Sequence, residues 1–114
     1  MTTIYGIKNC DTMKKARTWL NERAIEHTFW NYKKDGIDQP VLEKAITEHG
    51  WETVINRRST TWHQLDDTTK ASMDADKAIP LAIENPSIVK RPLLIHNGKT
   101  YIGFKDAAYK DIFQ

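Results

Sequence analysis

The first 32 residues of this 114-residue chain constrain its fold most strongly, because two strand patterns flank one helix pattern. Thr2–Tyr5 and Glu26–Tyr32 alternate along the chain and contain β-branched and aromatic residues, as half-buried strands do. Between them, apolar residues recur at helical spacing from Met13 to Ala24, which predicts a helix from Asp11 to about Arg23. Two strands joined by a helix over about 30 residues are expected to lie parallel in one sheet.

The last quarter of the chain carries a second strong signal. Asn97-Gly98 stands between Leu93–His96 and Lys99–Ile102, and such a pair between two strand patterns predicts an antiparallel hairpin with a two-residue turn. Asp106–Phe113 then reads as a closing helix. The residues expected to face inward on this helix are Ala108, Ile112 and either Tyr109 or Phe113.

The middle of the chain is expected to be helical after a turn at Lys33–Gly36. Asp38 is a cap, Pro40 suits a first turn and Gly50 ends the helix. From Trp51 to Val89, apolar residues come in short interrupted groups, which predicts an insertion of short helices. Expected caps in this stretch are Thr60 or Thr61 and Asp74. Pro80 is expected to kink or restart the helix that ends near Asn85-Pro86.

Cys10 is the only cysteine, and it falls where the first helix is expected to begin. The first N–H groups of a helix lack internal partners and carry the positive end of its dipole, so a thiol there has a pKa of about 3.5–7.5 instead of about 8.5. Lys8, Lys14 and Lys15 add positive charge nearby. From position alone, Cys10 is either a nucleophilic thiolate or a small buried apolar residue.

The run Tyr5–Thr12, the following Lys14-Lys15-Ala16 and Trp19-Leu20, and the distant Lys90–Leu93 closely resemble the arsenate reductase-like thiol proteins. Within them the chain is similar to the YffB branch, which is related to glutaredoxin-coupled arsenate reductases and to the Spx transcriptional regulators. The resemblance covers essentially the whole chain. It implies an α/β, thioredoxin-like fold with a four-stranded mixed sheet, flanking helices and a nucleophilic Cys10.

A length of 114 residues is typical of one domain, so we expect a single domain over residues 1–114. The resemblance implies a helical insertion, at about 37–88, between the strand-helix-strand unit and the C-terminal hairpin and helix. It also implies a cis peptide bond before an active-site proline, Pro92, facing the cysteine loop. Arg91 matches the family's arginine ahead of that proline. Arg58, or less directly Arg57, matches an arginine of the insertion.

An arginine suits an anionic substrate, because its planar guanidinium binds carboxylates and oxyanions through two parallel hydrogen bonds. Arg91 and Arg58 could instead be ordinary surface charges or helix-end partners. Arsenate reductases of the family carry a further arginine after the hairpin, but no arginine follows Arg91 here, and Lys105 cannot supply the same fork. The candidate anion-binding residues are Arg91, Arg58, Arg57, Lys8, Asn9, Asp11 and Thr12.

Dithiol chemistry would need a second cysteine, but the position three residues after Cys10 is Met13. An external thiol must therefore resolve any adduct. We expect a glutathione-dependent monothiol reductase that uses glutathione as co-substrate, without a tightly bound cofactor, and that is served by glutathione or a glutaredoxin-type donor. The alternatives are a glutaredoxin-coupled arsenate reductase and, from another class, an Spx-like regulator that binds RNA polymerase.

Composition narrows the partners and the compartment. The four histidines are not spaced as metal ligands, and one cysteine cannot form a zinc set, so no metal is expected. No phosphate-binding or dinucleotide motif is present. A net charge of +2 in short separated clusters argues against direct nucleic-acid binding, and no run approaches the roughly 20 apolar residues of a membrane span. With no export signal and a reactive thiol, we expect a cytoplasmic monomer.

Overall fold

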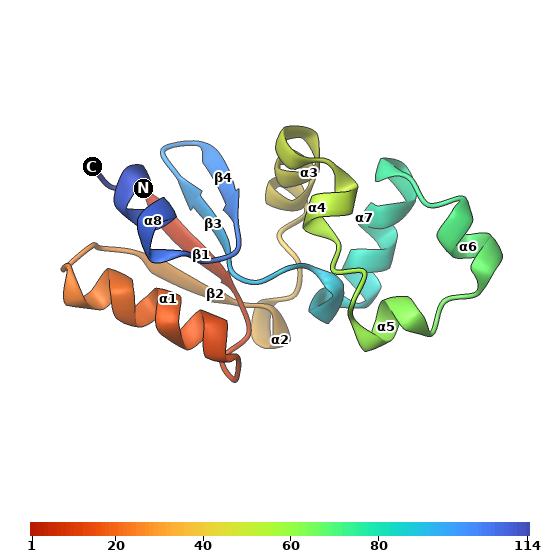
Figure 1. Cartoon of the computed structure of the whole chain (residues 1–114), viewed down its shortest axis with the longest axis horizontal. Helices are drawn as coiled ribbons and strands as arrows, with labels where there is room; N and C mark the ends of the chain where they lie inside the picture. Colours follow the sequence, from red (N-terminus) through yellow and green to blue (C-terminus); the bar gives the residue numbers. More distant parts are fainter. The chain divides into compact units, whose positions relative to one another are not determined.

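The computed structural model describes residues 1–114, which form two compact units. The first comprises Met1–Asp35 and Arg91–Gln114, and the second comprises Gly36–Lys90. The expected helical insertion falls within the second unit, whereas the reading of 1–114 as a single domain stays a prediction. The elements of the first unit (Figure 1) are β1 (Thr2–Gly6), α1 (Asp11–Glu22), β2 (Thr28–Asn31), α2 (Tyr32–Asp35), β3 (Leu93–His96), β4 (Lys99–Ile102) and α8 (Asp106–Ile112).

The four strands form one mixed sheet in the order β2-β1-β3-β4. β1 is parallel to β2, whereas β3 is antiparallel to both β1 and β4. Tyr5 is paired with Trp30 of β2 and with Leu93 of β3, which fixes the register of the two central strands. The predicted four-stranded mixed sheet, the parallel pairing of the first two strands and the C-terminal hairpin are all confirmed.

The core of the first unit lies between one face of the sheet and the helices α1 and α8. Ile4 and Leu94 are cross-strand partners and therefore share this face. Both are fully buried in a cluster with Met13 of α1 and Tyr109 of α8. The apolar stripe predicted for α1 is confirmed up to Leu20, but Ala24 lies beyond the helix, is exposed and has a φ of 53°.

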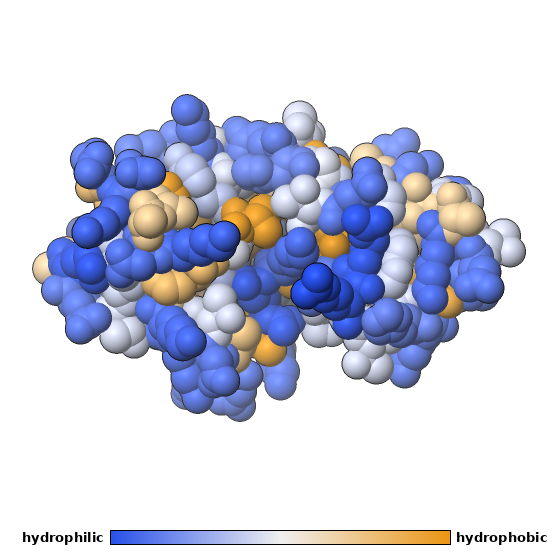
Figure 2. Space-filling view, viewed as in Figure 1, coloured by the Kyte–Doolittle hydropathy of each residue, from blue (hydrophilic) through white to orange (hydrophobic).

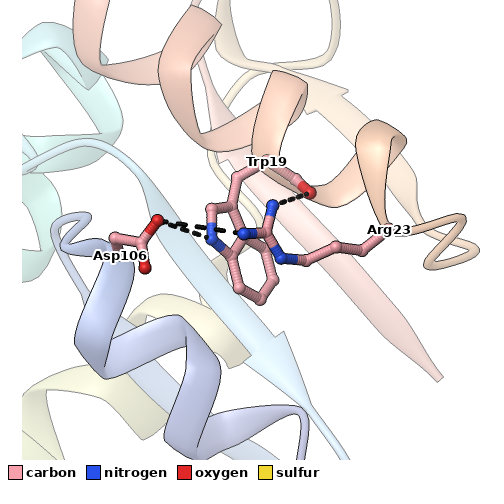
Figure 3. Close-up of polar contacts among 3 residues, drawn as sticks. All are labelled: Trp19, Arg23 and Asp106. Atoms are coloured by element: carbon pink, nitrogen blue, oxygen red, sulfur yellow. Dashed lines mark hydrogen bonds and ion pairs between the residues drawn. The ribbon is translucent and has the colours of Figure 1, made fainter.

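Polar contacts join α1 to the first turn of α8 (Figure 3). The indole Nε1 of Trp19 donates a hydrogen bond to Oδ2 of Asp106 at 3.2 Å. Arg23 lies over the indole with its guanidinium carbon 3.9 Å from a ring centroid, and it donates to the Trp19 carbonyl at 3.2 Å. Its guanidinium is also 3.9 Å from Asp106. These contacts hold the two helices together at the rim of the core.

The second unit consists of helices. Asp38 accepts a hydrogen bond from the Val41 N–H at 3.5 Å, and Gly50 follows the helix with a φ of 85°, so both predicted ends of this helix are confirmed. Asp74 also caps a helix, as predicted, by accepting from the Lys77 N–H at 2.8 Å. The elements are α3 (Gln39–His49), α4 (Trp51–Val54), α5 (Thr60–His63), α6 (Asp67–Ala71), α7 (Ala75–Glu84) and the 3₁₀ helix η1 (Pro86–Ile88).

Two predictions in this unit were wrong. Ser59, not Thr60 or Thr61, caps α5, because its extended backbone lets its hydroxyl accept from the Trp62 N–H at 3.2 Å. Pro80 does not restart the helix, because α7 runs without interruption to Glu84, and a kink at Pro80 stays a prediction. Proline has no N–H, so Pro80 cannot donate the helical hydrogen bond to the Asp76 carbonyl. Both residues are exposed, so water can donate to this carbonyl instead. The predicted end of the helix near Asn85-Pro86 is confirmed.

Two local predictions in the first unit were also wrong. Most of the predicted turn at Lys33–Gly36 belongs to the short helix α2, which starts where the Asn31 side chain accepts from the Lys33 N–H at 3.0 Å. Ala108 of α8 is exposed, which contradicts its predicted inward position, whereas the predicted alternative Tyr109 is confirmed as the residue of this helix that is buried. The larger ring of Tyr109 occupies the core by packing edge-on against Trp19, with ring centroids 5.5 Å apart.

The surface seen in Figure 2 is mostly hydrophilic, with hydrophobic residues in small separate areas. The large hydrophobic residues that are exposed are Met1 and Ile83. None of the helices combines the length and the apolar character that crossing a membrane requires.

Candidate thiolate site

Cys10 is the N-cap residue of α1, as its position in the sequence predicted. Its backbone is extended, with φ −141° and ψ 124°, and its carbonyl accepts the first helical hydrogen bond from the Lys14 N–H at 2.9 Å. The cysteine loop (residues 7–10) connects the end of β1 to this point. Cys10 is partly buried and packs against the core cluster of the first unit, so the sulfur has a defined environment yet remains accessible.

The surroundings of Cys10 favour the thiolate. Partial burial by itself raises the pKa of the thiol, but the Met13 N–H, the hydrogen bond and charge of Arg91 and the Thr12 N–H together outweigh it and lower the pKa below its ordinary value. The thiol forms no capping hydrogen bond, so these groups act chiefly on the charged form. A cysteine with a lowered pKa and partial exposure has the properties of a reactive thiol.

The register of the central strands brings Arg91 to Cys10. Tyr5 of β1 is paired with Leu93 of β3, and the two strands are antiparallel. The C-terminal end of β1 and the N-terminal end of β3 therefore lie side by side. Arg91 comes two residues before Leu93 and reaches Cys10 from this end of β3. The Arg91–Pro92 peptide bond is cis, which confirms that prediction, and Pro92 is buried with its carbonyl accepting from the Gly103 N–H at 2.9 Å.

Four further candidates surround Cys10 along the chain. Lys8 and Asn9 are exposed in the cysteine loop, Asp11 is exposed as the first residue of α1, and Thr12 is half-buried in the same turn. Only Thr12 has a described interaction with the sulfur, through its backbone N–H. Their roles in anion binding stay predictions.

Arg57 and Arg58 both lie in the second unit and are exposed, but their side chains differ. The guanidinium of Arg57 is 3.8 Å from Glu52 and 5.9 Å from a ring centroid of Trp51. The Arg58 backbone N–H donates to the Asn56 side chain at 3.0 Å, and its guanidinium makes no hydrogen bond or ion pair. Arg58 is therefore the better candidate of the two for an external anion, and this role stays a prediction.

Met13 is a site residue that the sequence interpretation missed. It was noted only because it occupies the place of a second cysteine, yet the hydrogen bond from its N–H is the largest single contribution that lowers the pKa of Cys10, while Arg91 contributes through both a hydrogen bond and its charge. Its buried side chain also packs against Gly6. The Cys-x-x-Met spacing was the available signal, since the N–H three residues after an N-cap residue points toward the cap side chain. No group of three or more histidine, cysteine or acidic side chains is arranged to hold a metal.

A parallel pair, an antiparallel hairpin, helices against the sheet, a cysteine at the start of α1 and a cis-proline before β3 define a thioredoxin-like protein with a single cysteine. Within that class, the chain belongs to the ArsC family, whose model matches residues 5–112.

Solved structures and curated relatives agree with this assignment. The structure of a protein named YffB is 50% identical, with a TM-score of 0.92 over 97% of both chains. An arsenate reductase-related protein from Brucella melitensis is 46% identical, with a TM-score of 0.76 over 99% of this chain and 94% of that one. The global transcriptional regulator Spx of Streptococcus mutans is 31% identical over 109 residues, which cover 93% of this chain and 78% of the regulator.

Proposed function

We propose that this protein is a glutathione-dependent monothiol reductase with Cys10 as its nucleophile. The observation that carries the proposal is the pairing of Cys10 with Arg91 at the N-terminus of α1, which together lower the pKa of the thiol. Arg91 would also bind the carboxylate of an incoming anionic thiol compound. We place the reaction in the cytoplasm, where reduced glutathione is available, and we expect the protein to act as a monomer.

The proposed cycle has two thiol–disulfide exchanges. In the first, the Cys10 thiolate attacks the glutathione sulfur of a mixed disulfide, forms a Cys10–glutathione disulfide and releases the substrate thiolate. In the second, the thiolate of a free glutathione attacks that adduct, releases the Cys10 thiolate and leaves as glutathione disulfide. The second step needs an external thiol because the chain has no other cysteine.

The test is adduct formation with oxidised glutathione, followed by intact mass. The wild-type protein should gain one glutathione, and Cys10→Ser should gain none. A charge-assisted hydrogen bond contributes roughly 1.5–3 kcal/mol, so Arg91→Ala should slow adduct formation about 10- to 150-fold at subsaturating glutathione disulfide, and Arg91→Lys should recover only part. An Arg91→Ala variant that reacts as fast as wild type would remove Arg91 from the site.

Arg58 can be tested against a matched neighbour. Arg57→Ala is the control, because Arg57 already interacts with Glu52 and Trp51. If Arg58 contributes to anion binding, Arg58→Ala should slow adduct formation while Arg57→Ala should not. Equal rates in the two variants would assign both arginines to the surface.

Arsenate reduction is the second candidate. The chain belongs to the ArsC family, and a 46% identical relative is named an arsenate reductase (ArsC)-related protein. In that reaction the Cys10 thiolate would displace water from protonated arsenate and form a sulfur–arsenic bond. Two glutathione thiols, with the help of a glutaredoxin, would then supply the two electrons that reduce As(V) to As(III), release arsenite and the Cys10 thiolate, and end as glutathione disulfide. The absence of any arginine after Arg91 weakens oxyanion binding relative to such enzymes. Glutathione- and glutaredoxin-dependent formation of arsenite from arsenate would favour this candidate over general disulfide reduction.

A regulatory role is the third candidate, and the similarity to Spx supports it. In this case the protein would bind RNA polymerase and Cys10 would act as a sensor or have no redox role. Direct binding of the purified protein to RNA polymerase, combined with failure to form a glutathione adduct, would put this candidate first.

A further inference from the structure

Met13 and Gly6 are in unusually close contact. Met13 is fully buried in the first turn of α1. A Cβ atom added to Gly6 would lie 2.8 Å from its Cε and 3.1 Å from its Cγ, and its Sδ would be nearer still. Cβ atoms in proteins essentially never come within 3.0 Å of such neighbours, so a larger residue at position 6 would require the outer part of the buried Met13 side chain to move.

The backbone conformation at position 6 does not require a glycine. The other four glycines have positive φ values, where glycine is favoured, but Gly6 lies in β1 outside that region. A glycine within a strand weakens it through lost packing and backbone entropy. The close approach of Met13 is thus the structural reason for a glycine here.

The contact joins the two ends of the cysteine loop. Gly6 is the last residue of β1 and is held in the sheet by its pairing with Asn31. Met13 lies three residues after Cys10, and the hydrogen bond from its N–H is the largest single contribution that lowers the pKa of the thiol. A buried side chain that rests on the end of a central strand therefore fixes where this N–H lies.

We propose that Gly6 and Met13 are a pair of positioning residues that hold the first turn of α1, and with it the Met13 N–H, in place beside the sulfur of Cys10. The inference rests on the proposed function, in which Cys10 reacts as a thiolate. In that function, Met13 affects the reaction through Cys10 and does not contact substrate. The fit between a small residue at position 6 and a long flexible one at position 13 sets the pKa of the Cys10 thiol.

The experiment measures the rate of Cys10 alkylation by iodoacetamide against pH, together with urea unfolding, in four proteins: wild type, Gly6→Ala, Met13→Ala and the double variant. In Gly6→Ala the new methyl group should push the first turn away from the sulfur and raise the alkylation midpoint. A rise of half to one pH unit corresponds to about 3- to 10-fold slower alkylation well below the midpoint. Met13→Ala removes the side chain that rests on Gly6, so its midpoint should rise as well. In the double variant the new methyl group fills part of the emptied space, so its midpoint should lie nearer that of the wild type than the two single changes added together.

Asp106→Ala is the matched control. It should destabilise the same unit through the distant contact with Trp19, without touching the first turn of α1. If Gly6→Ala loses stability but keeps the wild-type alkylation midpoint, as Asp106→Ala is expected to, the pair is merely structural and the proposal is wrong. If Gly6→Ala does not fold, Met13→Leu carries the test, because it nearly conserves volume but is branched where Met13 rests on Gly6. An unchanged midpoint in Met13→Leu would then overturn the proposal.

This test separates the inference from the proposed function. A wild-type midpoint at or above about 8.5, the value of a free thiol, would contradict the proposed nucleophile whatever the variants do. A low wild-type midpoint that does not change in Gly6→Ala would leave the nucleophile in place and remove only the role of the pair.

Discussion

Replacing Asp106 with alanine should destabilise the first unit by about 2 kcal/mol, from three contributions of unequal size. The hydrogen bond from the buried Trp19 indole is the largest, at about 0.5–1.5 kcal/mol net. The charge of Asp106 at the first residue of α8 contributes about 0.3–1 kcal/mol. The ion pair with Arg23 contributes least, at roughly 0.2–1 kcal/mol, because both side chains are exposed (39% and 63%) and separated by 3.9 Å.

The variant Asp106→Asn separates these contributions. Its amide oxygen can still accept from the indole, so it should lose only the two charge-dependent contributions, or about half of the effect. The assay is urea unfolding followed by far-ultraviolet circular dichroism, with unchanged m-values as the condition for comparing free energies.

A double-mutant cycle with Trp19→Phe tests the reasoning itself. Phenylalanine keeps an aromatic ring in the core but removes the donor, so Asp106→Ala should cost about 1 kcal/mol less in the Trp19→Phe background than in the wild type. If Asp106→Ala costs the same in both backgrounds, the hydrogen bond contributes nothing and the account of this contact is refuted.

Three further results are expected. The alkylation midpoint of Cys10 should lie below about 8.5 and rise in Arg91→Ala, because the guanidinium favours the thiolate; an unchanged midpoint would contradict this. Tyr109→Phe should stabilise the protein by about 1 kcal/mol in urea unfolding, since the buried hydroxyl has no hydrogen-bond partner. Burial and the nearby N-terminal charge lower the pKa of His96, so its contribution to stability should be present above about pH 6.5 and be lost as the pH falls through the folded value, and His96→Gln should flatten that dependence.

Features set by neighbouring residues were predictable from the sequence. Asn97 and Gly98 have φ values of 49° and 82°, which is what a two-residue hairpin turn of this composition requires. The ends of α3 follow in the same way from Asp38 and Gly50. The place of Cys10 at the start of α1 needed only a strand pattern followed by a helix pattern. In each case the physical cause lies within a few residues of the feature.

Features set by tertiary packing were not predictable. The exposure of Ala108, and the burial of Tyr109 in preference to Phe113, depend on the rings that α8 meets in the core, which local periodicity does not identify. The contact between Gly6 and Met13 crosses a loop and depends on how closely α1 approaches β1. The pairing of Arg91 with Cys10 joins positions 81 residues apart and was expected only through the family resemblance. Here the strand register, which is a property of the whole sheet, supplies the proximity.

The two ends of the chain lie together, far from the thiolate. The Met1 carbonyl accepts from the Asn97 N–H at 3.2 Å, and Phe113 packs against His96 with ring centroids 4.5 Å apart. Both chain ends therefore lie beside the β3–β4 hairpin, at the opposite end of β1 from the start of α1 (Figure 1). The five residues of β1, at about 3.3 Å each, separate these ends from the cysteine loop. An affinity tag, a surface attachment or a fused domain at either end would therefore leave the sulfur of Cys10 open to the solution.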